Sequence, residues 1–279
     1  MKSNHVFLWL ILAFMLSPSS VPSCEQIAKS VITMTEGSAQ QEVLTSSEIV
    51  EGLKTALSIG TDSSVSATSR VNGFYKDEAI KILLPPEAEV VYEYRDKPLV
   101  KAIGLDQKIE DAVIALNRAA EDAAKAAGPV FKKAIISMSI TDGLSILNGK
   151  NPSDPNQPLV FDSTAATSFL QFTTIEELRN AFSPIVNTSL DKKLMANYSP
   201  NQIWNALTSS YNGVASKSFG MIKPINNVDL GAYVTEKALE GLFLKISEEE
   251  IKIRRDPLEW AKTSVGKILE RVFGRQLSN

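Results

Sequence analysis

The densest group of ionisable side chains in the sequence is SEEEIKIRR, residues 247–255. Apolar residues at helical spacing precede and follow it, so either Glu249 or Glu250 lies on the apolar face of the predicted helix. A carboxylate in that position needs a cationic partner, or else its pKa rises. Catalytic acids and structural ion pairs both arise in this way. Glu249, Glu250 and Arg254 are therefore candidate buried polar or ligand-contacting residues, and a salt-bridged solvent face is the alternative.

The same stretch contains two pairs of opposite charge four residues apart. Glu248 precedes Lys252, and Glu250 precedes Arg254. With the acid first, this spacing stabilises a helix. We therefore predict both ion pairs, with Arg254 or a nearby lysine neutralising a buried acid as the structural alternative to a functional site.

A second polar group lies in LNRAAED, residues 116–122, beside a row of alanines. Asn117 and Arg118 are candidate members of a buried polar network there, and exposure to solvent is the alternative. Two carboxylates facing each other across a cleft could also hydrolyse glycans. A carboxylate-dependent hydrolase is therefore one of the functions that the sequence leaves open.

Histidine and cysteine chemistry are nearly excluded by composition. His5 is the only histidine, Cys24 is the only cysteine, and both lie at the N-terminal end. Removal of a leader would leave no imidazole for a Ser-His-Asp triad, a general base or a zinc or copper site. We therefore expect no metal site, no catalytic residue of these classes and no cofactor.

The N-terminal stretch HVFLWLILAFMLSPSSVPSC has the composition of an export signal. Its apolar run, residues 6–16, is shorter than the roughly 20 residues that span a bilayer, and Lys2 and a small-residue segment flank it. VPSC matches a lipobox apart from Pro22, and it also fits an ordinary cleavage site. A lone free thiol is unfavourable in an oxidising compartment, whereas an acylated cysteine is not. We predict a signal peptide over 1–23 and lipid attachment at Cys24; plain cleavage and a retained anchor are the alternatives.

The sequence that follows the predicted signal peptide indicates an all-α fold. Residues 24–45 resemble a polar tether, and 46–274 form a single domain of about eight to ten helices with no significant sheet. Thr45 and Glu48 form a capping box, Ser199–Pro200 and Asp229 mark later helix starts, and Gly149 closes a short helix. We further expect a break within residues 58–74, one helix over 87–103, a second capping box at Thr174 and Glu177, and a last helix from Pro257 to about Phe273.

The clearest helical pattern covers residues 106–127. Its apolar positions follow spacings of four and three, which places them on one helix face. The later members are alanines, so a neighbouring helix can approach closely there. Ala119 lies off this stripe and is expected to tolerate a larger side chain. The stripe consists of Ile109, Val113, Leu116, Ala120, Ala123 and Ala127.

The net charge of the chain argues against nucleic acid as a binding partner. The formal net charge is −3 at pH 7, and it becomes −4 once Lys2 is removed with the leader. Neither a basic excess nor a polybasic run is present, so we expect no nucleic-acid partner. The expected partners are a membrane, through the lipid anchor, and a protein or a small apolar ligand.

Several stretches together resemble one bacterial family, the domain of unknown function 4197. They are EGLKTALSIGTDSSV (51–65), LLPP (83–86), LNRAAEDAA (116–124), ITDGLSILNG (140–149) and VTEKALEGLFLKISEEEIKIRRDP (234–257). The resemblance implies an all-helical exported protein of Gram-negative bacteria, often a lipoprotein, and it implies no activity. Where the family's pattern would have a basic turn, this chain has FLQFTT at 169–174, which removes support for an anion-binding role of that turn.

Three functions are compatible with these observations. The first is a helical binding or scaffolding module of the bacterial envelope, located in the periplasm and held at the inner or outer membrane, that uses a groove between helices. The second is the carboxylate-dependent envelope hydrolase. The third is a carrier of an apolar ligand between helices.

The leader generates the first testable prediction. Mass spectrometry of the N-terminus of the protein from its own cells should find residues 1–23 removed and Cys24 carrying acyl chains. An unmodified Cys24, or a chain that retains Met1, would contradict the prediction.

Overall fold

The computed structural model describes residues 43–154, 156, 160–226, 228–262 and 265–274. The chain divides after Val43 into two units, and all helices of the described residues lie in the second, Leu44–Asn279. The predicted signal peptide, Cys24 and most of the predicted tether lie outside the described residues.

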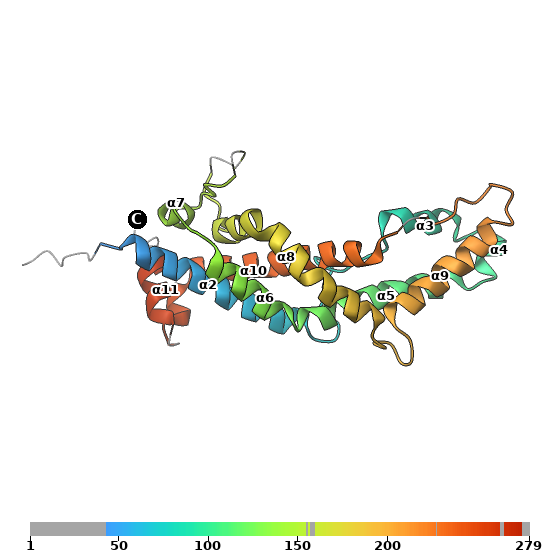
Figure 1. Ribbon diagram of the computed structural model, residues 1–279, viewed down its shortest axis with the longest axis horizontal. Helices are drawn as coiled ribbons and strands as arrows, with labels where there is room; N and C mark the ends of the chain where they lie inside the picture. Colours follow the sequence, from blue (N-terminus) through green and yellow to red (C-terminus); the bar gives the residue numbers. More distant parts are fainter. Residues whose placement is uncertain (1–42, 155, 157–159, 227, 263–264, 275–279) are drawn as a thin grey trace, which may run out of the picture. The chain divides into compact units, whose positions relative to one another are not determined.

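Ten α-helices and two 3₁₀ helices form the described part of this unit (Figure 1). The part of the chain that the structure describes contains no strand, only an isolated bridge between Met195 and Tyr198. The predicted all-α fold is therefore confirmed. The helices are α2 (Ser46–Thr68), η1 (Pro86–Ala88), α3 (Val90–Tyr94), α4 (Pro98–Lys101), α5 (Leu105–Ala124), α6 (Ala127–Ser137), α7 (Gly143–Leu147), α8 (Ala165–Asp191), α9 (Pro200–Ala215), α10 (Leu230–Arg255), η2 (Pro257–Lys262) and α11 (Gly266–Phe273).

Helix α10 is the central element of the packing. It lies against α2 on one side and α8 on another, and α5 packs on both α8 and α9 (Figure 1). Helix α6 contacts α2 and α8, while α11 contacts η2 and α2. Their buried apolar side chains form one continuous core. Among the described residues, no helix has both the length and the apolar composition needed to cross a membrane.

Helix α2 begins as predicted but continues further than predicted. The Thr45 hydroxyl accepts from the Glu48 amide at 3.2 Å, and the Glu48 carboxylate accepts from the Thr45 amide at 2.8 Å, which completes the capping box. The expected break within 58–74 falls late in that stretch, because the helix runs on to Thr68 before it ends. Thr61 and Thr68 donate their hydroxyls to carbonyls one turn earlier, so both buried hydroxyls are satisfied within the helix. These small residues are buried in the core, and packing outweighs their low helix propensity.

Three other helix boundaries differ from prediction. The helix expected over 87–103 is divided into η1, α3 and α4, because Pro98 forces Lys97 into an extended conformation (φ −69°, ψ 135°). Thr174 does not start a helix; it lies buried inside α8 and donates to the Leu170 carbonyl at 2.6 Å. The segment after Pro257 forms η2 and then α11 rather than one helix. The predicted starts at Ser199–Pro200 and Asp229 are confirmed.

The predicted stripe is buried along its whole length, but α5 carries only its first five members. The helix expected to reach residue 127 ends at Ala124, and Ala127 is the first residue of α6. Ala120 and Ala123 are fully buried, which confirms that this face packs against other helices. The expectation for Ala119 is wrong, because its exposed fraction is also 0%. Helix α5 contacts α8, α9 and α10, so its buried arc is wider than one stripe.

The burial of α5 gives the second prediction. Ala120→Leu should lower the free energy of unfolding by about 1–3 kcal/mol, the usual effect of overpacking a filled core. Ala181→Leu on the exposed face of α8 is the matched control and should have much less effect. Urea unfolding measures both variants, and equal small effects would contradict the packing assigned to α5.

Candidate functional site

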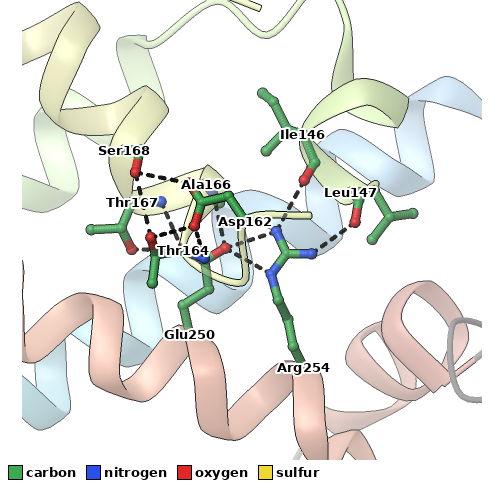
Figure 2. Close-up of polar contacts among 9 residues, drawn as sticks. All are labelled: Ile146, Leu147, Asp162, Thr164, Ala166, Thr167, Ser168, Glu250 and Arg254. Atoms are coloured by element: carbon green, nitrogen blue, oxygen red, sulfur yellow. Dashed lines mark hydrogen bonds and ion pairs between the residues drawn. The ribbon is translucent and has the colours of Figure 1, made fainter. Parts of the chain in front are cut away.

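Glu250 of α10 is the buried acid that the sequence pattern indicates, with an exposed fraction of 2%. Its carboxylate accepts hydrogen bonds from the amides of Ala166 (3.0 Å) and Thr167 (2.7 Å) and from the Thr167 hydroxyl (2.7 Å), as Figure 2 shows. These amides are the second and third of α8, the ones that a capping side chain normally satisfies. Thr164, the residue at the cap position, makes no such bond. A side chain of another helix therefore caps α8.

Arg254, one turn further along α10, binds the C-terminal end of a second helix, α7. Its Nε donates to a Glu250 oxygen at 2.8 Å (Figure 2). Its two terminal nitrogens donate to the carbonyls of Leu147 (2.8 Å) and Ile146 (3.0 Å) at the C-terminal end of α7. A cation is favourable there, because the last carbonyls of a helix have no partner within it and carry partial negative charge.

Two aromatic rings enclose the Arg254 guanidinium. Its central carbon lies 5.8 Å from the centre of the Phe161 ring and 5.3 Å from that of Phe273 in α11. Gly149 makes the approach of Phe161 feasible, because a Cβ there would lie 2.5 Å from the ring. Its φ of +73° is also the left-handed conformation expected after a helix end, as predicted for this residue.

Glu250 and Arg254 together form what we call the clamp, which joins α7, α8, α10 and α11. Each Glu250 oxygen accepts at least two hydrogen bonds, and each guanidinium nitrogen donates at least one. The arrangement suits an ionised carboxylate, because every partner is a donor. A general acid must instead reach its substrate. The geometry of Glu250 is that of a structural ion pair, the alternative stated for this residue.

Glu249 has a different environment. Its side chain is partly buried against α2 and pairs with Lys252 at 2.7 Å. The predicted pair Glu248–Lys252 is therefore wrong, whereas Glu250–Arg254 is confirmed. Glu248 pairs instead with Lys245, which also binds Asp77 at 2.7 Å. The hydrogen bond from Lys245 lowers the pKa of Asp77.

Asn117 on α5 is fully buried and fixes the segment that follows α2. Its side chain accepts from the Ile82 amide at 2.9 Å and donates to the carbonyls of Ile82 and Val113, both at 2.7 Å. All of its hydrogen bonds go to backbone groups. This matches a role in positioning the chain.

Arg118 contributes to a neighbouring network around Glu121. The Glu121 carboxylate, nearly buried, accepts from the amides of Phe74 and Tyr75 at 3.2 Å and from Arg118. Arg118 also donates to the Asn72 side chain at 2.8 Å. No hydrogen bond among the described residues joins this network to the clamp, so the five candidate residues form separate structural groups.

One hollow of the described surface lies where no site was predicted from the sequence. An open groove of about 790 Å³ lies between α2 and α6. Ile136 of α6 forms one wall and is 75% exposed, and the Lys54 ammonium donates to its carbonyl at 2.8 Å. The only sequence signal was the presence of Val50 and Ile59 among polar residues of α2. The lining consists of Ser46, Ser47, Val50, Glu51, Lys54, Thr55, Ser58, Ile59, Asp62, Ile135, Ile136 and Val265.

One family model matches the chain, over residues 43–274, and its description is Protein of unknown function (DUF4197). This match confirms the resemblance seen in the sequence. No curated protein matches the chain, and no solved structure does.

The clamp gives the third prediction. Glu250→Gln should lower the free energy of unfolding by about 3–5 kcal/mol, because it leaves Arg254 buried without its counter-charge. Glu249→Gln is the matched control; it breaks a partly exposed pair and should cost about 0–1 kcal/mol. Thermal or urea unfolding distinguishes them. Equal stabilities would show that Glu250 does not hold the two helix ends.

A double variant separates capping from simple charge pairing. An ion pair without further contacts can often be replaced by apolar residues at no cost. Glu250→Leu with Arg254→Met would instead leave the Ala166 and Thr167 amides of α8 without the carboxylate that caps them, each costing about 1–3 kcal/mol when buried. We therefore expect this double variant to remain strongly destabilised, and wild-type stability would refute the capping role.

Proposed function

Because the chain belongs to the DUF4197 family, which implies no activity, we propose from its own geometry that it is a binding module of the bacterial envelope. In this proposal the groove between α2 and α6 takes an amphipathic helical segment of a partner protein. The observation that carries it is the exposed Ile136 side chain on the wall of a largely apolar groove.

The dimensions and chemistry of the groove favour a helix as occupant. Its α2 wall runs from Ser46 to Asp62, about 24 Å at 1.5 Å per residue, or more than four turns. Its lining combines apolar side chains such as Val50 and Ile136 with hydroxyls and charged groups such as Glu51 and Lys54. An amphipathic helix can place its apolar face on the apolar side chains and keep its polar face in water. An acyl chain would need cover on all sides.

The two other functions have less support from the geometry. A hydrolase needs an accessible acid, and the acids singled out in the sequence are engaged in ion pairs, with Glu250 buried in the clamp. A carrier needs an enclosed apolar cavity, and the described hollow is open to solvent.

The proposed location is the envelope, with Cys24 as the lipid attachment site. The support for this part is the N-terminal sequence: a short apolar run, a small-residue segment and the only cysteine. A tether between Cys24 and α2 would place the groove, which begins at Ser46, close to other proteins of the same membrane.

Site-specific photo-crosslinking in the native cells tests the groove and is the fourth prediction. A crosslinking amino acid at Ile136 should attach to a segment of another protein with apolar residues three and four positions apart. The same crosslinker at Phe172, an exposed apolar position on α8 outside the groove, should not. A synthetic peptide of the attached segment should bind the chain, and Ile136→Asp should weaken it at least about tenfold, as expected for a central contact.

Other adducts would contradict the proposal in distinct ways. A lipid adduct at Ile136 would favour the carrier, and an adduct to a second copy of the chain would favour self-association. Equal adducts at Ile136 and Phe172 would show that the groove has no specific occupant.

A further inference from the structure

The loop between α9 and α10 presents an apolar tip to solvent. Phe219 is 97% exposed and Met221 is 73% exposed, with Gly220 between them. The backbone turns at this point, with φ of +53° at Phe219 and +82° at Gly220. A bulky residue seldom adopts a positive φ, so the chain accepts an unfavourable conformation where it displays an aromatic ring.

The base of this loop is firmly fixed. Ser218 is buried; its hydroxyl donates to the Ala215 carbonyl at 2.7 Å and accepts from the Ile222 amide at 2.9 Å. The Asn212 side chain bonds both the amide and the carbonyl of Ile225 at 2.8 Å. Ile222 and Ile225 are buried, so the loop directs two apolar residues into the core and two outward. The exposure of Phe219 and Met221 is therefore a consequence of an ordered loop.

Positive charge flanks the tip. Lys217 and Lys223 are exposed on either side of it, and neither has an ion pair with any residue that the structure describes. Residues 192–228 contain four lysines and no Asp or Glu, although the whole chain has a net charge of −3. Lys192 and Lys193 precede α9, at the opposite end of that helix from the tip, so Lys217 and Lys223 are the cations of the loop itself.

We propose that residues 217–223 contact an anionic lipid bilayer. Phe219 and Met221 enter the boundary between head groups and acyl chains, and Lys217 and Lys223 bind lipid phosphates. An apolar tip between cations suits this boundary, because the apolar stems of lysine lie along the lipid while the ammonium groups stay in water. A protein partner would need a pocket shaped for the tip, whereas a bilayer accepts it without one.

A contact of this size is weak by itself. One apolar insertion gives only marginal membrane binding, and stable attachment takes two signals. A chain already held at the membrane needs no strong second contact, since the tether raises the local concentration of lipid. The inference thus rests on the membrane location in the proposed function, but not on the groove. In this arrangement the loop would set the orientation of α9 and α10 at the bilayer.

A polarity-sensitive fluorescent amino acid at Met221 of the full chain tests the contact directly. With vesicles of phosphatidylcholine and phosphatidylglycerol, its emission should shift to the blue and become protected from an aqueous quencher. The same probe at Glu177, an exposed position on α8, should show neither change. Vesicles are titrated to about 10 mM lipid, well above the roughly 0.1 mM at which a single acyl chain is half bound, so that even a weak contact is observed without acylation of Cys24. The probe reports only on its own surroundings, so the result does not depend on the occupant of the groove.

Two further variants test the named side chains. With the probe at Met221, Phe219→Ser should raise the lipid concentration at half-maximal shift by about tenfold, the effect of losing one buried apolar side chain. Val71→Ser, at another exposed apolar loop position, is the matched control and should leave it unchanged. Lys217→Gln with Lys223→Gln should reduce the shift to that seen with phosphatidylcholine alone.

An emission at Met221 that remains aqueous with anionic vesicles would overturn the proposal. A shift that appears only on addition of envelope proteins would also overturn it and would assign the tip to a protein partner. Either result leaves the crosslinking at Ile136, and hence the groove proposal, unaffected.

Discussion

The first turn of α8 and the last turn of α7 both bind side chains of α10. The first amides of α8 receive no bond from Thr164, and the last carbonyls of α7 point into the protein. Glu250 and Arg254, one turn apart on α10, satisfy both ends at once. Because charged groups are costly to bury unless every partner is present, this interaction tolerates only one relative placement of the three helices. It also fixes the two ends of the connection between α7 and α8.

Polar side chains on α5 perform a similar task for the segment between α2 and η1. Asn117 and Glu121 bind its backbone at Ile82 and at Phe74 and Tyr75. Phe74 then packs on α10 at Gly241, where a Cβ would lie 2.7 Å from the ring. Buried polar groups in this fold therefore complete backbone groups that no regular element satisfies, which is the usual condition for burying them.

Because the buried polar groups position the backbone, the candidate binding sites lie on the surface. The buried acids are engaged in positioning the chain, and the described core is a continuous apolar cluster. The groove beside Ile136 and the loop tip at Phe219 have no such role in positioning the chain. Both display apolar side chains that a stable fold gains nothing by exposing, and such surfaces commonly mark interaction sites. They suit partners of different kinds, a helix for the groove and a lipid surface for the loop.

The sequence by itself determined the all-α fold, the capping box at Thr45, the helix start at Ser199, the buried face of α5 and the pair Glu250–Arg254. Each follows from local spacing, since residues three and four apart share a helix face. Only the tertiary structure decided that α2 and α8 run on through their Thr- and Ser-rich segments, because burial against other helices outweighs local propensity there. It alone showed that Ala119 is buried and that Glu250 caps α8, since both depend on residues distant in the chain. The groove and the exposed loop tip depend on which surfaces the neighbouring helices leave uncovered. The spacing of residues within one helix does not indicate which surfaces these are.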